Sequence, residues 1–215
     1  MLTAVESLGS FTLNRIEHLG RFGRFMAQTL AALFTPPLKF RRIMDRVHFI
    51  GSKSLWLIVL ISSFTGAVLG LQVYYTLIKF GAQTRVGTVV ALSLIRELGP
   101  VICALMVMGR AGSSLSSELG IMQITEQFDA LKIMGLDPFR YFMAPILVAS
   151  VVSHFLLTSI FDVVGILGGF AITGGLLGVP SGSYFGGITD FLEFDDIVNG
   201  VIKSCVFGVV VAWVS

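Results

Sequence analysis

Long apolar stretches alternate with short polar ones along most of the chain. Three stretches of 21 to 27 residues carry no formal charge; they lie between Lys53 and Lys79, Arg140 and Asp162, and Asp162 and Asp190. A helix needs about 20 apolar residues to cross the hydrocarbon core of a membrane. The pattern therefore predicts membrane-spanning helices at about 54–78, from about 86, from about 141 past Asp162, and from about 197 to 215.

The composition agrees with this pattern. Of the 215 residues 54% are hydrophobic and 13% are charged, against about a quarter charged in soluble domains. Disordered chains and disulfide-rich secreted domains are thereby excluded. Cys103 and Cys205 lie in apolar stretches and form no metal motif, and no basic run with interleaved aromatics suggests nucleic-acid binding. We expect an all-α, polytopic integral membrane protein.

The first 35 residues predict an amphipathic helix. Apolar Leu13, Ile16 and Leu19 alternate at three- and four-residue spacing with basic Arg15 and Arg21. Such a helix lies either in the membrane interface or against the cytoplasmic side of the protein itself. Pro36-Pro37 is expected to end it. We divide the chain into an N-terminal interfacial part, 1–53, and a transmembrane domain, 54–215.

The basic residues predict the orientation. Residues 1–53 hold eight Lys and Arg and residues 110–140 hold three, whereas 162–196 hold none. The positive-inside rule then places the N-terminus and the 110–140 loop in the cytoplasm. The glycine-rich and acidic stretch around 162–196 lies on the opposite side.

Charges within the spans are candidate functional residues, because each costs about 2.5–3.5 kcal/mol on insertion scales. Arg96 and Glu97 lie in the second span and Lys203 in the last. They form either a polar patch for a charged headgroup or an ion pair that locks two helices. Gly99-Pro100 predicts a kink or break, since proline removes a helix hydrogen bond, and we treat the pair as a hinge.

Two other groups suggest weaker alternatives. His154 and Asp162 are two helical turns apart, which fits a proton relay but more often a histidine satisfied within the bundle and an aspartate at the rim. Ser113, in the Gly109–Ser114 stretch, with His154 would make an intramembrane hydrolase only if the two lie within hydrogen-bond reach. The topology places them at different depths. We expect no metal site, and no Walker A sequence is present.

The loop at 110–140 contains a further expected helix. Residues 121–134 place Glu126, Asp129 and Lys132 on a polar side and Phe128 and Leu131 on an apolar face. Gly135 fits the C-terminal cap. A short amphipathic helix between two spans is suited to dock into a cleft on a cytoplasmic motor.

Several strings in this region resemble the MlaE (YrbE) permease family, in the family's order and spacing. They are Arg96-Glu97-Leu98-Gly99-Pro100, Gly109-Arg110-Ala111-Gly112-Ser113, Glu118-Leu119-Gly120-Ile121-Met122, Glu126-Gln127-Phe128-Asp129-Ala130-Leu131 and Met134-Gly135-Leu136-Asp137-Pro138. The resemblance extends more diffusely from about Gly51 to Ser215. In the family a further span usually follows the one matching Lys203, so the resemblance implies a subunit longer than this sequence.

The resemblance implies a homodimeric permease of the Gram-negative bacterial inner membrane that works with a cytoplasmic ABC ATPase, a periplasmic MCE-domain lipid-binding protein and often a STAS-domain protein. It implies phospholipid transport between inner and outer membrane, which maintains outer-membrane asymmetry. ATP is bound by the partner, and this chain is expected to bind no cofactor. The matching positions imply a lipid cavity at Arg96, Glu97, Leu98 and Lys203, and an ATPase-coupling helix with Glu126, Gln127, Phe128, Asp129, Leu131 and Gly135.

The hypothesis is therefore a lipid-moving ABC permease that is not itself an enzyme. A proton- or ion-coupled secondary transporter using Glu97, His154 or Asp162 is the main alternative. An intramembrane serine hydrolase and a purely structural scaffold are further ones. Among these candidate functions, only the ABC permease requires a helix such as the one expected at 121–135.

Overall fold

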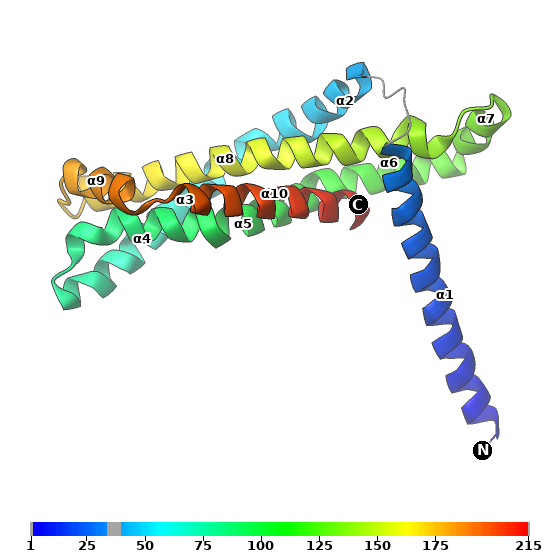
Figure 1. Ribbon diagram of the computed structural model, residues 1–215, viewed down its shortest axis with the longest axis horizontal. Coiled ribbons are helices and arrows are strands. Elements are labelled where there is room, and N and C mark those ends of the chain that lie inside the picture. Colours follow the sequence, from blue (N-terminus) through cyan, green and yellow to red (C-terminus); the bar gives the residue numbers. More distant parts are fainter. Residues whose placement is uncertain (1, 34–39, 215) are drawn as a thin grey trace.

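The computed structural model describes residues 2–33 and 40–214; the expected helix end at Pro36-Pro37 lies outside them. The described residues are mostly helical, and the long helices lie side by side (Figure 1). By length and composition four helical segments there can span a membrane: Phe40–Phe80, Gln83–Ile124, Phe139–Gly175 and Phe194–Val214. The expected four spans are confirmed.

Each of the first three spans is built from several consecutive helical pieces. The first contains α2 (Phe40–Val47), η1 (His48–Ser52), α3 (Lys53–Leu77) and η2 (Ile78–Phe80). The second contains η3 (Gln83–Arg85), α4 (Val86–Ser93), η4 (Leu94–Leu98), α5 (Gly99–Val107), η5 (Met108–Gly112) and α6 (Ser113–Ile124). The third contains η6 (Phe139–Met143) and α8 (Ala144–Gly175), and the fourth is α10 (Phe194–Val214). The remaining helices are α1 (Leu2–Leu33), α7 (Gln127–Ile133) and α9 (Ser181–Phe191).

Glycines set the spacing between α3 and α8. A Cβ atom at Gly66 would collide with the backbone carbonyl of Gly165, and one at Gly70 would lie 3.1 Å from that of Gly169. The small-residue pair in the first span therefore packs within this chain. Close backbone approach of this kind is how small residues stabilise helix pairs in lipid, where no hydrophobic force drives association.

A stripe of small residues also brings α10 close to the second and third spans. Asp196, Gly200, Ser204 and Gly208 recur every four residues and are all buried. A Cβ at Gly200 would lie 2.8 Å from the carbonyl oxygen of Ile95. The Ser150 hydroxyl on α8 donates to the Gly208 carbonyl at 2.8 Å. The stripe thus fixes α10 against η4 on one side and α8 on the other.

The basic and acidic ends lie at opposite ends of the bundle. Figure 1 places α7, the end of α6 and the start of α2 at one end, and α9 and the start of α4 at the other. This separation matches the charge distribution from which the orientation was predicted. Arg110 ties the basic end together by donating to the Phe49 carbonyl and the Ser54 hydroxyl, both at 3.2 Å.

The helix α1 leaves the bundle at its basic end and points steeply away from it (Figure 1). Phe25 packs on Phe139 of η6 with ring centroids 5.9 Å apart. Leu13, Ile16 and Leu19 remain 65–69% exposed. The helix is confirmed. Its last turns pack on the protein, whereas its middle presents apolar side chains outward, as an interfacial helix does.

Two expectations about the second span need correction. The helix expected at 121–134 does not form as one piece: the span continues as α6 to Ile124, so the polar loop begins well after residue 110. Nothing between 113 and 124 stops a helix, and the turn comes at Glu126, whose φ of 55° is left-handed. The kink or break expected at Gly99-Pro100 is instead a π-helical turn, η4, closed by the Gly99 N–H donating to the Leu94 carbonyl.

Candidate functional site

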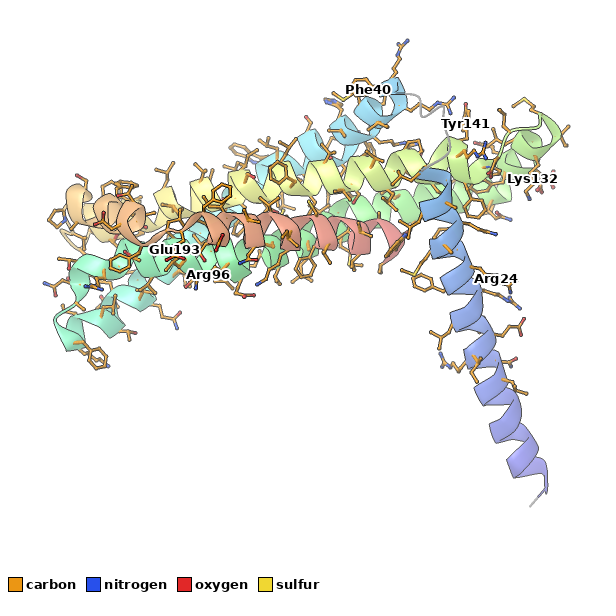
Figure 2. All side chains as sticks on the ribbon, in the orientation of Figure 1. Arg24, Phe40, Arg96, Lys132, Tyr141 and Glu193 are labelled. Carbon is orange, nitrogen blue, oxygen red and sulfur yellow. The ribbon has the colours of Figure 1, made fainter. Side chains whose placement is uncertain are left out.

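Four charged side chains meet where η4 packs on α10. Arg96 binds Asp196, with Nη2 and Nε 2.6 and 2.7 Å from Oδ1. Lys203 binds Glu97, with Nζ 2.5 Å from Oε1. The structure therefore brings Arg96, Glu97 and Lys203 together, and it contains the ion pair between two helices that was one of the two interpretations of these charges. Figure 2 shows Arg96 beside the start of α10, near Glu193.

Proline explains why Lys203 sits where it does. In an α-helix the N–H of residue 100 would donate to the carbonyl of Arg96, four residues earlier, but Pro100 has no N–H. Lys203 Nζ supplies the missing donor at 2.8 Å from the Arg96 carbonyl oxygen. The predicted hinge residues and the predicted charged residues thus belong to one hydrogen-bonded unit. In this unit α10 satisfies a backbone group left free by the second span.

Asp196 was missed by sequence reasoning, which assigned it to an acidic patch outside the membrane. It lies in the first turn of α10, where its Oδ2 accepts from the backbone N–H of Glu193 at 3.4 Å. A carboxylate at this position caps a helix N-terminus and is stabilised by the helix dipole. The signal that could have found it is the four-residue repeat of Asp196, Gly200, Ser204 and Gly208, which places the aspartate on the packed face of the helix.

The four side chains differ in exposure. The Asp196 side chain is 7% exposed, whereas those of Lys203, Arg96 and Glu97 are 39%, 50% and 68% exposed. The accessible part of the cluster thus contains two cations and one anion. The guanidinium has five N–H donors, and the interactions with Asp196 leave some of them unused. Leu98, the fourth predicted cavity residue, is partly buried and packs against the hydrophobic core.

The predicted coupling residues lie at or near α7. Gly135, with φ of 71°, ends the helix in a Schellman motif: its N–H donates to Lys132 and that of Leu136 to Leu131, both at 2.9 Å. Lys132 Nζ lies 3.0 Å from Asp129 Oδ1 on the exposed side.

The apolar face of this helix is divided. Leu131 is buried and Phe128 packs edge-on against Phe142 of η6, with ring centroids 6.4 Å apart. Ile133 of the same helix is 88% exposed, and Ile124 at the end of α6 is 84% exposed. One part of the face thus anchors α7 to the bundle, and the other part points outward from the basic end.

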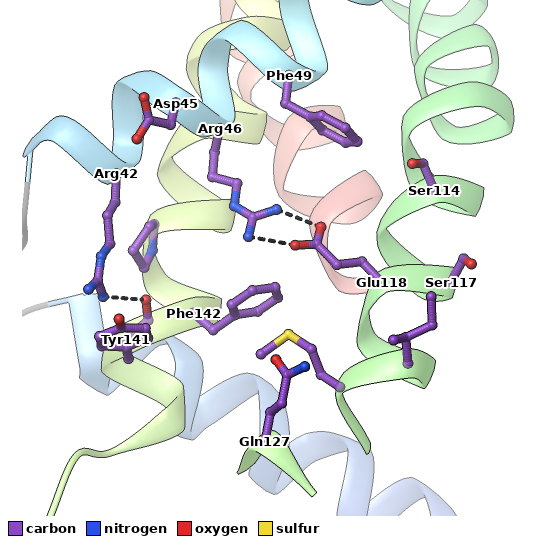
Figure 3. Close-up of a pocket in the computed structure, with 13 residues that line it drawn as sticks. Arg42, Asp45, Arg46, Phe49, Ser114, Ser117, Glu118, Gln127, Tyr141 and Phe142 are labelled. Carbon is purple, nitrogen blue, oxygen red and sulfur yellow. Dashed lines mark hydrogen bonds and ion pairs between the residues drawn. The ribbon is translucent and has the colours of Figure 1, made fainter. Parts of the chain in front are cut away.

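An open pocket of about 860 Å³, lined by both charged and apolar side chains, lies beside α7 (Figure 3). Arg46 of α2 makes a two-pronged ion pair with Glu118 of α6 across it, at 2.6 and 2.9 Å. Arg42 stacks on Tyr141, its Cζ 3.3 Å from the ring centroid. Gln127 of α7 also lines the cavity. These contacts connect α2 to α6 and η6.

The residues of the alternative functions are not assembled. The Ser113 hydroxyl donates to the Gly109 and Arg110 carbonyls of its own helix. His154 is fully buried, and neither ring nitrogen has a hydrogen-bond partner in the described part of the chain. Asp162 lies against Gly99 rather than on the His154 ring. The serine–histidine pair that a hydrolase requires is therefore not formed.

Comparison with known proteins connects this geometry to a family. The family model described as Permease MlaE matches residues 43–215. The intermembrane phospholipid transport system permease protein MlaE of Haemophilus influenzae is 40% identical over 212 residues, which cover 98% of this chain and 81% of that protein. A probable ABC transporter permease protein of Rickettsia bellii is 36% identical over 215 residues, 100% of this chain and 83% of that protein.

A plant relative is more distant. The chloroplastic protein TRIGALACTOSYLDIACYLGLYCEROL 1 of Arabidopsis thaliana is 31% identical over 188 residues, which cover 87% of this chain and 54% of that protein. The bacterial matches extend over more than four fifths of both partners, and the family model includes all four spans apart from the first residues of α2. The chain therefore belongs to the MlaE permease family.

Proposed function

We propose that the chain is the membrane-spanning permease subunit of an ABC transporter that moves phospholipid between the inner and outer membranes and so maintains outer-membrane lipid asymmetry. The observation that carries the proposal is the cluster of Arg96, Glu97, Asp196 and Lys203 where η4 packs on α10. Charges inside a membrane are costly and mark transport pathways. The 40% identity to a phospholipid transport permease supports the same substrate.

The exposed side chains of the cluster would contact the lipid headgroup, while apolar side chains on the lipid-facing helices would hold the acyl chains. Arg96 and Lys203 provide donors for a phosphate, which guanidinium and ammonium groups bind strongly. The hinge at Gly99-Pro100 would let η4 adjust as the lipid enters and leaves. Residues 54–215 form the permease domain in this proposal, and residues 1–53 its interfacial part.

The exposed end of α7 would dock on a cytoplasmic ABC ATPase, which binds and hydrolyses ATP in place of this chain. Ile124 and Ile133 offer apolar contacts, and Glu126, Gln127 and Asp129 offer polar ones. Movement of α7 would reach the bundle through Phe128 on Phe142 and through the Gly135 cap. The other partners in the proposal are a second copy of the chain, a periplasmic MCE-domain protein and a STAS-domain protein, all at the Gram-negative inner membrane.

The test is a pull-down of the tagged full-length subunit from its own membranes in mild detergent, with bound proteins and lipids identified by mass spectrometry. We expect an ABC ATPase, an MCE-domain protein and phospholipid. Ile133→Glu and Asp129→Lys should abolish recovery of the ATPase, because both alter the exposed side of α7.

Leu176→Glu is the matched control, since Leu176 is also an exposed apolar residue, 74% accessible, at the opposite end of the bundle. It should leave the ATPase bound. If the wild-type chain is recovered without any ATPase, or if Leu176→Glu and Ile133→Glu lose it equally, the proposed role of α7 is wrong.

A further inference from the structure

The charged cluster at η4 and α10 is electrically balanced. Arg96 and Lys203 contribute two positive charges, and Glu97 and Asp196 contribute two negative ones. In a medium of low dielectric constant, the interaction of a unit charge with its surroundings is several times stronger than in water. A cluster without net charge therefore binds a headgroup without net charge more readily than a charged headgroup, because the charged headgroup would leave a net charge in the site.

The exposed part of the cluster has charges of both signs close together. Arg96 and Glu97 are neighbours in sequence, and each is at least half exposed. Arg96 retains unused donors for a phosphate, and Glu97 has a second carboxylate oxygen for an ammonium group. A headgroup with both a phosphate and an amine matches this arrangement, because each of its charges meets the opposite one.

Asp196 is what makes the cluster neutral. It is almost fully buried behind Arg96, and Glu193 and the N-terminus of α10 hold its second oxygen. These contacts do not depend on a lipid, so Asp196 keeps its place when a headgroup arrives. Asp162 lies against Gly99 and makes no ion pair with the four residues.

We propose that Asp196 determines the headgroup class of the transported lipid: by neutralising Arg96 from behind, it selects phospholipids whose headgroup carries no net charge, such as phosphatidylethanolamine, over anionic ones. Asp196 is then a specificity-determining residue that need not touch the lipid. This inference rests on the proposed function and deepens it.

The experiment uses the whole transporter complex, purified from cells and incubated with vesicles that contain equal amounts of phosphatidylethanolamine and phosphatidylglycerol. Mass spectrometry measures the ratio of the two lipids that remain bound. Asp196→Asn leaves the cluster with one net positive charge, and we expect the ratio to shift about tenfold toward phosphatidylglycerol, as a unit charge at roughly 8 Å in a partly screened site predicts. Asp195→Asn removes the same charge from the adjacent, exposed residue and should leave the ratio unchanged.

A charge-restoring variant separates this idea from simple damage to the fold. Arg96→Gln leaves one net negative charge and should shift the ratio toward phosphatidylethanolamine. Arg96→Gln combined with Asp196→Asn is neutral again and should move the ratio back from the value of Asp196→Asn toward phosphatidylethanolamine, even though a phosphate donor is lost. Equal ratios in wild type and Asp196→Asn, with both complexes still binding lipid, would overturn the inference and leave the proposed function standing. A wild-type complex that binds no phospholipid would overturn both.

Discussion

Replacing Gly66 by alanine should strongly destabilise the bundle, because α3 and α8 have no room for a methyl group there. The new Cβ would collide with the carbonyl oxygen of Gly165 and approach its Cα at 2.9 Å. The obstacle is backbone, so it cannot change rotamer, and the two helices must separate. This would also loosen the neighbouring contact between Gly70 and Gly169, one turn away.

The magnitude follows from two opposing effects. Overpacking a well-packed site costs about 1–3 kcal/mol, and a backbone collision lies at or above the upper end of that range. Alanine regains about 1 kcal/mol of helix propensity relative to glycine. The net loss is about 2 kcal/mol or more, which lowers the midpoint of thermal unfolding by roughly 4–8 °C for a chain of this size.

The assay is thermal unfolding of the purified subunit in detergent, compared among three alanine variants. Gly120→Ala is the matched control, because Gly120 lies within α6 and a Cβ there meets nothing within 4 Å. It should be neutral or slightly stabilising. Gly165→Ala should be intermediate, since its Cβ would meet the flexible Leu94 side chain at 3.0 Å. If Gly66→Ala unfolds at the same temperature as Gly120→Ala, the close packing of α3 on α8 is wrong.

Two further predictions concern the ends of the bundle. Arg46→Gln and Glu118→Gln should each lower the free energy of unfolding by about 1 kcal/mol, and the double variant should lower it little more than either. A double-mutant cycle on unfolding measures this coupling. Additive losses would mean that the two-pronged ion pair contributes nothing. Tyr184 of α9 donates to the Ile166 carbonyl at 3.0 Å, and burial raises the pKa of its hydroxyl to about 12. Because the folded-state pKa lies above the ordinary value of 10, the stabilisation is complete below pH 10 and is lost as the pH rises from 10 to 12. Tyr184→Phe should therefore flatten the stability profile in that range, and an unchanged profile would contradict the assignment.

Hydropathy and charge patterns were sufficient for the spans, since a membrane imposes a minimum apolar length that few other structures share. They also identified Arg96, Glu97 and Lys203, because a charge in an apolar run is conspicuous. Helix ends were harder to predict. The sequence around 121–134 looks amphipathic as a whole, but the actual break depends on the left-handed backbone of Glu126. A residue type that rarely adopts that conformation gives no sequence signal for it.

Asp196 could not be recognised from its neighbours, because Asp190, Glu193 and Asp195 make it look like one more residue of a solvated acidic patch. Its difference is its position on the helix. It shares a face with Gly200, Ser204 and Gly208, and that face is buried. Reading helical faces within polar segments, as well as within apolar ones, would have separated Asp196 from Asp195.

The cluster and the irregular second span are consequences of the same local arrangement. Pro100 leaves the Arg96 carbonyl without its helical donor, and in lipid such a group must be satisfied by a neighbouring element. Gly200 lets α10 approach Ile95 closely enough for Lys203 to reach that carbonyl. Lys203 then brings a positive charge into the membrane, and Glu97 balances it. Asp196 balances Arg96, and it lies seven residues and about 10 Å earlier than Lys203 on the helix. Each charge in the cluster is therefore tolerated because another is present. Single substitutions should consequently change both the packing and the net charge of the cluster, and only charge-restoring pairs can separate these two effects.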